Sequence, residues 1–448
     1  MSAPGHGERV LSTLNEDGTR RWLTPRLARG KFLTGRRIVG FSLIVLFVVL
    51  PRIRIGGRPA LLVDLITREI SVFGTVFRPS DGFVLMLLGL TIVIAVFLVT
   101  ALFGRVWCGW ACPQSVYLEH VFRPIERRFK KHPVVKWGLY IGLSFALSNV
   151  FLAYFVGTDR LEQWVFESPL QHPGGFAVVV GVAGLMLFDF AWFREQVCIV
   201  ACPYGRLQAV LLDKQSLIIG YDAKRGEPRG KPKKKLPVLA ERGDCIDCAA
   251  CVVVCPTGID IRDGLQMECI GCAQCADACD HVMAKLGKPP KLIGYTSQDQ
   301  LEGKPRRLLR TRTVVYPAML VVVASLLVWG VGSRPTTDVV VERTSGPSFV
   351  VLPDGRISAQ ARIKLENHTD EDRHYSIQLA RTTDAELRLS QAVWLVKPRK
   401  SIEIVLFVDA ARSTYVNGER KVQLRINDDQ GFERVVEVTL LGPAGDAR

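Results

Sequence analysis

Long apolar runs separated by basic segments dominate the first three quarters of the chain. Four of them approach the ~20 residues that a membrane-crossing helix needs, and they lie at residues 83–104, 134–156, 176–193 and 314–332. A fifth run, 38–50, has only thirteen residues before Pro51, a length that by itself suits a signal-peptide core or a short interfacial segment. The pattern predicts a membrane protein with soluble parts.

The charges between these runs predict how the chain crosses the membrane. Lys and Arg are concentrated in residues 1–37, 105–133 and 194–313, and such segments stay on the cytoplasmic side. This placement requires a crossing before the second run, so the short run, extended into Phe32 and Leu33, is expected to span. Five spans then leave the amino terminus inside and the carboxyl end outside.

Two connections between the spans are expected to be loops. Residues 51–82 carry an amphipathic patch, Leu61–Phe77, and a short acidic stretch with Asp159, Glu162 and Glu167 follows the third span. A lysine-rich, proline-broken linker is expected at Lys231–Pro237.

The last part of the chain has a different period. Ile357, Ala359, Ala361, Ile363 and Leu365 alternate with polar residues, which is the pattern of a half-buried strand. Val422, Leu424 and Ile426 alternate in the same way after Asn417-Gly418, a dipeptide typical of hairpins. These short strands predict an antiparallel, immunoglobulin-like sandwich. No cysteine follows Cys279, so this domain is expected to rest on its own core.

The expected fold is an α-helical membrane protein with five transmembrane helices, a cytoplasmic two-cluster ferredoxin domain and a C-terminal all-β domain. The expected parts are a basic cytoplasmic segment (1–37), four transmembrane helices (38–222), a linker with the ferredoxin domain (223–312), the fifth helix (313–332) and the β-sandwich (335–448). The net charge of +15 fits basic cytoplasmic loops. A nucleic-acid partner is not expected, because no aromatic-studded basic patch accompanies the charge.

Eight of the 12 cysteines form the pattern C-x2-C-x2-C-x3-C written twice. This is the spacing of bacterial ferredoxins, in which the fourth cysteine of each run binds the other of two 4Fe-4S clusters. The predicted ligands are Cys245, Cys248, Cys251 and Cys279 for one cluster, and Cys269, Cys272, Cys275 and Cys255 for the second. Zinc knuckles or a disulfide knot are the alternatives, but zinc takes its four ligands in pairs, which interleaved triplets fit poorly.

The other four cysteines form two C-x3-C-P motifs at the ends of the second and fourth spans: Cys108 with Cys112, and Cys198 with Cys202. On a helix, residues four apart lie on one face, so each pair can chelate one soft metal ion. Thiolates select Cu(I), zinc or iron–sulfur centres. The proline after each second cysteine predicts that the helix ends there. Buried structural cysteines or two disulfides are the alternatives.

Four other ionisable residues lie near these motifs or in a span. His120, His132 and His281 are interpreted as ordinary loop or packed side chains rather than ligands. Asp189, late in the fourth span, is a functional candidate because charges in spans are costly, and a structural hydrogen bond explains it equally well.

The chain resembles the cytochrome c oxidase accessory protein family, called CcoG, RdxA or FixG. The resemblance lies in Phe97–Val116, Arg194–Pro203, Tyr221–Gly230 and Cys255–Gln266, and it extends over nearly the whole chain. One departure from generic ferredoxins is Asp280, which stands where proline usually follows the last cysteine.

The resemblance implies a function in the maturation of cbb-type haem–copper oxidases. The chain would reduce Cu(II) to Cu(I) at Cys108, Cys112, Cys198 and Cys202, which match the family's copper motifs. The implied partners are copper, oxidase assembly factors or a copper chaperone, and an unknown electron donor. The implied location is the bacterial inner membrane, with the ferredoxin domain cytoplasmic and the β-domain periplasmic. An electron-transfer subunit of a quinol-linked chain and a non-enzymatic assembly scaffold are the competing interpretations.

Overall fold

The computed structural model describes residues 12–15, 17, 19–78, 81–230, 243–305, 310–333, 335–342, 349–369, 371–381, 384–398 and 400–443. The chain forms two compact units, residues 1–328 and 329–448, and each is described by itself. The predicted linker Lys231–Pro237 lies outside the described residues, as do the first eleven residues of the basic amino-terminal segment.

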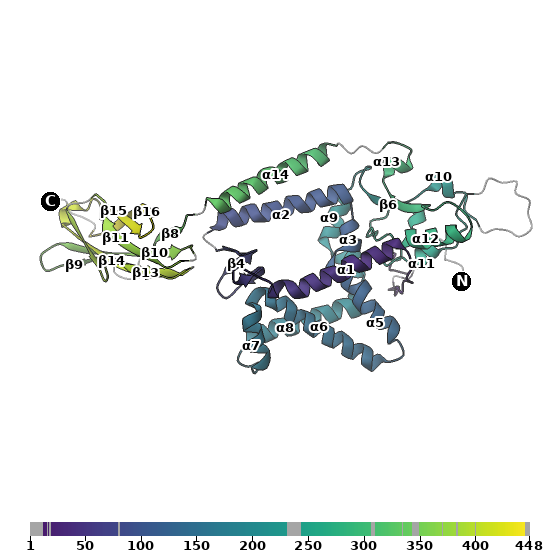
Figure 1. Ribbon diagram of the computed structural model, residues 1–448, viewed down its shortest axis with the longest axis horizontal. Helices are drawn as coiled ribbons and strands as arrows, with labels where there is room; N and C mark the ends of the chain where they lie inside the picture. Colours follow the sequence, from purple (N-terminus) through teal and green to yellow (C-terminus); the bar gives the residue numbers. More distant parts are fainter. Residues whose placement is uncertain are drawn as a thin grey trace, which may run out of the picture. The chain divides into compact units, whose positions relative to one another are not determined.

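Among the residues that the structure describes, five helices are long and apolar enough to cross a membrane (Figure 1). They are α1 (Lys31–Val49), which continues into the 3-10 helix η1 (Leu50–Arg52), α2 (Gly82–Phe103), α6 (Pro133–Val156), α8 (Pro173–Phe188), which continues into the π-helical turn η4 (Asp189–Phe193), and α14 (Thr311–Gly332). The first span is confirmed. It is longer than the apolar run 38–50 because the helix begins at Lys31 and includes the basic residues before that run. Helices α6 and α8 pack together, and α14 runs beside α2, where the rings of Phe97 and Tyr316 are 6.5 Å apart.

The two connections predicted as loops have regular structure instead. Residues 51–82 contain β1 (Arg54–Ile55), β2 (Arg58–Pro59) and an antiparallel sheet of β3 (Leu61–Asp64), β4 (Glu69–Val72) and β5 (Thr75–Phe77). The predicted amphipathic patch, Leu61–Phe77, thus forms the short strands β3 to β5. The tight turn between β4 and β5 is formed by Phe73 and Gly74, which both have positive φ. The acidic stretch forms α7 (Thr158–Phe166), and Arg160 in this helix pairs with Asp64 of the sheet at 2.9 Å.

Short helices follow the second and fourth spans. They are α3 (Val106–Trp110), α4 (Pro113–Tyr117), the π-helical turn η3 (Leu118–Phe122) and α5 (Arg123–Arg128) after α2, and the π-helical turn η5 (Val197–Ala201) and α9 (Pro203–Leu211) after η4. Proline occupies the first position of α4 and of α9, where its missing N–H costs no hydrogen bond.

The ferredoxin part is built on a two-stranded antiparallel sheet of β6 (Ile218–Tyr221) and β7 (Ile293–Thr296). Its helices are α10 (Ala223–Gly226), α11 (Ala250–Val253), the 3-10 turn η6 (Ile261–Asp263), α12 (Gln274–Lys285) and α13 (Gln298–Leu301). Ile219, Met283 and Leu292 are almost fully buried between sheet and helices. Asp277 of α12 accepts hydrogen bonds from the backbone of Phe32 and Leu33, which ties this part to the start of α1.

The second unit is an antiparallel sandwich. Its strands are β8 (Thr337–Glu342), β9 (Phe349–Val351), β10 (Ile357–Asn367), β11 (Arg373–Leu379), β12 (Ala385–Leu389), β13 (Trp394–Val396), β14 (Ser401–Ala410), β15 (Glu419–Asp428) and β16 (Glu433–Leu441), with the 3-10 turn η7 (Arg412–Thr414). One sheet has the order β12-β14-β10-β8 with β9 on β10, and the other has the order β13-β11-β15-β16.

The alternation predicted for β10 and β15 is confirmed, because the apolar positions of both strands are buried in one core. The turn at Asn417-Gly418 is also present, with both residues at positive φ. The dipeptide forms the predicted two-residue hairpin turn, in which Val416 and Glu419 exchange backbone hydrogen bonds. The long strands on either side belong to different sheets, however: β14 pairs with β10 and β12, whereas β15 pairs with β11 and β16. The turn therefore leads from one sheet to the other.

Candidate functional site

The eight ferredoxin cysteines line two separate small cavities. Cys245, Cys248, Cys251 and Cys279 line one of them, here called the first cage. Cys255, Cys269, Cys272 and Cys275 line the other, the second cage, which Cys251 also touches. In each cage three cysteines come from one run of the sequence and the fourth comes from the other run. The structure thus brings together the two sets that the spacing predicts.

Backbone geometry explains how each run wraps around its cage. Asp247 and Gly271 occupy equivalent positions in the two runs, as do Ala249 and Ala273, and all four have positive φ. Left-handed backbone at non-glycine residues is unfavourable by about 1–3 kcal/mol each and is concentrated at functional sites. The repeated turn directs three thiols inward before α11 or α12 begins.

The donor set of both cages fits 4Fe-4S clusters. Within the described part of the chain, no three His, Cys, Asp or Glu side chains are close enough to hold one metal ion. Four thiols spread around a cavity suit a cluster instead, because each thiolate binds a different iron. Burial raises the pKa of Cys251, Cys269 and Cys279 to about 12, so cluster assembly must release protons.

The two C-x3-C motifs are not continuous α-helices, contrary to the expectation. Cys108 lies in α3, but Cys112 is extended and caps α4. Cys198 lies in the π-helical turn η5, and Cys202 is extended and caps α9. The helix ends at each second cysteine as predicted, because the following proline excludes the helical conformation there.

The four thiols of these motifs lie near one another at the ends of α2 and η4. Each of Cys108, Cys112 and Cys198 is close enough to Cys202 for charge repulsion to matter. Burial raises the pKa of Cys108 to about 11, although the neighbouring Arg105 guanidinium lowers it. Burial also raises the pKa of Cys198, to about 12, and nearby thiolates add to the effect.

Two residues of this site were not foreseen from the sequence. Gln208 of α9 is fully buried; its Oε1 accepts a hydrogen bond of 3.0 Å from the Cys108 thiol, and its Nε2 lies 3.3 Å from Thr100 Oγ1. Arg105 is buried and donates to the carbonyl of Met267, in the loop before Cys269. The only available signal was an arginine shortly before each motif, Arg105 and Arg194.

The C-x3-C site is in direct contact with the second cage. Cys108 packs in one apolar cluster with Ile270 and Cys272, and Cys198 and Tyr204 pack against it. Gly109 makes the approach possible: a Cβ there would lie 2.7 Å from the Cα of Cys272 and 2.7 Å from the carbonyl oxygen of Ile270. The buried Arg36 of α1 donates its Nε–H to the Gly109 carbonyl at 2.7 Å.

A buried ion-pair network links the two motifs to the ferredoxin part. Arg123 pairs with Glu119 and, at 2.9 Å, with Glu195, which lies just before Cys198. Arg123 also donates to the carbonyl of Pro256 at 3.3 Å, next to Cys255. Removing one partner of a buried pair typically costs about 3–5 kcal/mol, so this network fixes the two parts against each other.

The three histidines and Asp189, which the sequence analysis also considered, do not join the cysteine sites. His120 packs against Gly40 and Phe41 of α1, and His132 and His281 are exposed. Asp189 accepts a hydrogen bond of 2.9 Å from Gln114 Nε2, which also donates to the Arg194 carbonyl. The structural interpretation of Asp189 therefore accounts for its position.

Fold and site together define a multi-pass membrane iron–sulfur oxidoreductase. Three family models match the chain: a 4Fe-4S binding domain at residues 85–132, a 4Fe-4S dicluster domain at 193–298, and the immunoglobulin-like fold at the C-terminus of FixG at 327–443.

Similarity to known proteins gives the family. Protein RdxA of Cereibacter sphaeroides is 35% identical over 387 residues, which cover 79% of this chain and 81% of RdxA. The nitrogen fixation protein FixG of Rhizobium meliloti is 30% identical over 495 residues, 95% of this chain and 94% of FixG. A crystal structure of a FixG-related protein from Vibrio parahaemolyticus covers 24% of this chain and 98% of its own, with 14% identity and a TM-score of 0.22. The chain belongs to the RdxA/RdxB/FixG family.

Proposed function

We propose that this protein reduces Cu(II) to Cu(I) at the four thiols of its C-x3-C motifs, with electrons that arrive through the second cage. The Cu(I) product is destined for the assembly of a cbb-type cytochrome oxidase. A 4Fe-4S cluster, when bound, supplies one electron at a time, and this matches the one-electron change from Cu(II) to Cu(I).

The contact between Cys108 and the second cage is the observation that supports this proposal best. Cys108 packs against Cys272, a predicted cluster ligand, so a metal ion on the Cys108 thiolate is separated from the cage by protein atoms in direct contact. A site meant only to hold a structural ion needs no such neighbour. Gly109 and Arg36, which maintain the contact, have no other evident purpose.

The side chains of the site explain how it treats copper. Soft thiolates prefer Cu(I), so the site favours the product of the reduction. Binding must displace the proton that Cys108 shares with Gln208, and the Arg105 guanidinium favours the resulting thiolate.

Replacing Cys198 and Cys202 with serine tests the location of the copper site. The double variant is expected to lose copper binding and to keep the visible absorbance of both clusters, because neither thiol lines a cage. Cys248→Ser is the matched control, in which one cluster is lost and copper binding persists. Copper retained by the double variant would place the site elsewhere, with His120 and His281 as the next candidates.

A further inference from the structure

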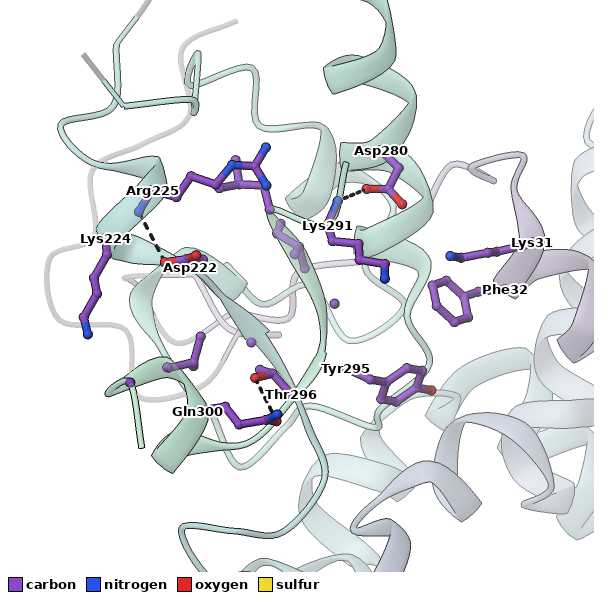
Figure 2. A pocket seen from close by; sticks show the side chains of 16 residues that line it. Lys31, Phe32, Asp222, Lys224, Arg225, Asp280, Lys291, Tyr295, Thr296 and Gln300 are labelled. Atoms are coloured by element: carbon purple, nitrogen blue, oxygen red, sulfur yellow. Dashed lines mark hydrogen bonds between the residues drawn. The ribbon is translucent and has the colours of Figure 1, made fainter. Parts of the chain in front are cut away.

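A large cleft in the ferredoxin part has no function in the account so far. Its volume is about 770 Å³, within the ~300–1,000 Å³ range of small-molecule sites. Strands β6 and β7 form its floor, and the start of α1 forms one side (Figure 2). No cysteine lines it, so it is distinct from both cages and from the C-x3-C site.

Part of the floor of the cleft is open backbone at Gly294, whereas Gly220 lies under the side chains of Thr296 and Leu301. Gly220 and Gly294 face each other across the two strands, and both line the cleft. A Cβ added to Gly294 would meet no atom within 4 Å. Glycine inside a strand weakens it and often marks a place where a ligand approaches the backbone closely. A planar ring can therefore approach the backbone closely at Gly294.

Aromatic and cationic side chains surround the floor. Phe32 and Tyr295 form an edge-to-face pair with their ring centroids 5.5 Å apart and make one wall (Figure 2). Lys31, Lys224 and Lys291 line the cleft and form no ion pair with any residue that the structure describes.

Arg225 and the carboxylates of Asp222 and Asp280 also line the cleft. Arg225 pairs with Asp244 at 2.5 Å. The carboxylates of Asp222 and Asp280 accept hydrogen bonds from the backbone N–H groups of Arg225 and Lys291. Lys291 itself has a φ of +66°, an unfavourable conformation for a lysine that is typical of functional positions. Lys31 and Lys291 extend from the same side of the cleft, whereas Lys224 extends away on the opposite side (Figure 2). The rim therefore offers two ammonium groups to an anion.

The cleft borders both cages. Leu292 and Ile293 line the cleft on one side and the first cage on the other. The Tyr295 hydroxyl donates to the carbonyl of Gly271, between Cys269 and Cys272, at 2.7 Å, and it accepts a hydrogen bond from Trp110 Nε1 at 2.7 Å. A ligand in the cleft is thus one layer of side chains away from the predicted clusters.

We propose that this cleft binds a flavin mononucleotide, with its ring on the open backbone at Gly294 against Phe32 and Tyr295 and its phosphate beside Lys31 and Lys291. Flavins take part in both hydride and one-electron chemistry, which suits an electron donor for iron–sulfur centres. The step balances as one reduced flavin giving one oxidised flavin, two protons to solvent and one electron to each of the two clusters. Binding is independent of the proposed copper chemistry, whereas the role of the flavin as the donor for copper reduction rests on it.

Flavin fluorescence quenching on the full-length, cluster-containing protein in detergent tests the binding. We expect saturable binding of flavin mononucleotide, at least tenfold weaker binding of riboflavin, which lacks the phosphate, and weaker binding at high salt. Gly294→Leu fills the floor and is expected to weaken binding at least tenfold. Gly138→Leu, at a helix position with open space around it, is the matched control and should bind as the wild type does.

The outcomes separate the possibilities. If Gly294→Leu does not fold with both clusters, Gly294→Ala serves, because its single added carbon meets no atom within 4 Å; it should weaken binding severalfold. Equal binding by wild type and the Gly294 variants, absence of saturable binding, or full competition by inorganic phosphate or anionic lipid vesicles would overturn the proposal. A second experiment adds photoreduced flavin to the protein without copper and measures the loss of visible cluster absorbance as the clusters become reduced. Bleaching without later copper reduction therefore contradicts only the proposed function.

Discussion

Replacing Gly109 with alanine tests the contact between the copper site and the second cage without removing any thiol. The added Cβ would lie 2.7 Å from Cys272 Cα and from the Ile270 carbonyl oxygen, whereas ordinary contacts begin at 3.4 Å. Helix α3 and the segment that carries Ile270 and Cys272 must therefore separate by about 0.7 Å. Both neighbours are backbone atoms, so no side-chain rotation relieves the clash.

The separation has an energetic and a functional consequence. Overpacking a close contact typically costs about 1–3 kcal/mol, and the Arg36 hydrogen bond to the Gly109 carbonyl is strained at the same time. We expect the second cage to lose its cluster at a lower temperature than in the wild type. We also expect Cu(II) reduction to slow, because its electron must cross the opened contact, while copper binding at the unchanged thiols persists.

The assay compares three proteins under anaerobic conditions. Copper binding, the loss of cluster absorbance on heating and the initial rate of Cu(I) formation are measured for wild type, Gly109→Ala and Gly142→Ala. The last is the control, since a Cβ at Gly142 meets nothing within 4 Å. Wild-type stability and rate in Gly109→Ala would refute the argument that this glycine is needed for the contact.

Three further predictions concern the cages, the membrane charges and the half-buried His120. Cys255→Ser should damage the second cluster more than the first, and Cys279→Ser should do the reverse, as read from iron content and electron paramagnetic resonance; equal damage in both variants would contradict the crossed assignment. A periplasmic reporter fused after residue 443 should be active and one inserted in Lys231–Lys235 inactive, and the opposite pattern would invert the orientation. Burial and the nearby charges of Arg36 and Arg37 lower the pKa of His120 to about 4. Below about pH 6.5 the unfolded chain therefore binds a proton at His120 that the folded protein does not bind. The free energy of unfolding should fall by up to ~3 kcal/mol as the pH drops from 6.5 towards 4. The thermal stability of His120→Gln should not show this pH dependence.

The sequence predicted the features that follow from local periodicity and spacing. The five spans were predictable because a helix needs a minimum apolar length to cross a bilayer. The sandwich was predictable because apolar and polar residues alternate along β10, which buries one face of the strand. The grouping of the cage cysteines followed from spacing as well, since two interleaved runs allow few ways to share eight thiols.

Features that depend on tertiary contacts could not be predicted. Gln208 lies outside the second C-x3-C-P motif, six residues after Cys202, and its importance is visible only once α9 places it beside Cys108. Nothing in the sequence around Gly109 indicates that its backbone lies in close contact with Cys272. The strands β3–β5 and the helix α7 were missed because short amphipathic and acidic stretches between spans resemble loops when their partners are unknown.

The central claim is that electrons from the clusters reduce copper at the C-x3-C thiols. Anaerobic titration of Cu(II) into dithionite-reduced, desalted protein tests it most directly, with cluster absorbance, Cu(I) captured by a chelator and free thiols followed together. We expect Cu(I) to appear in step with cluster re-oxidation, one Cu(I) per electron lost from the clusters, while the number of free thiols stays constant. Cu(I) that appears while the clusters stay reduced and thiols disappear would contradict it, because the cysteines would then be the reductant.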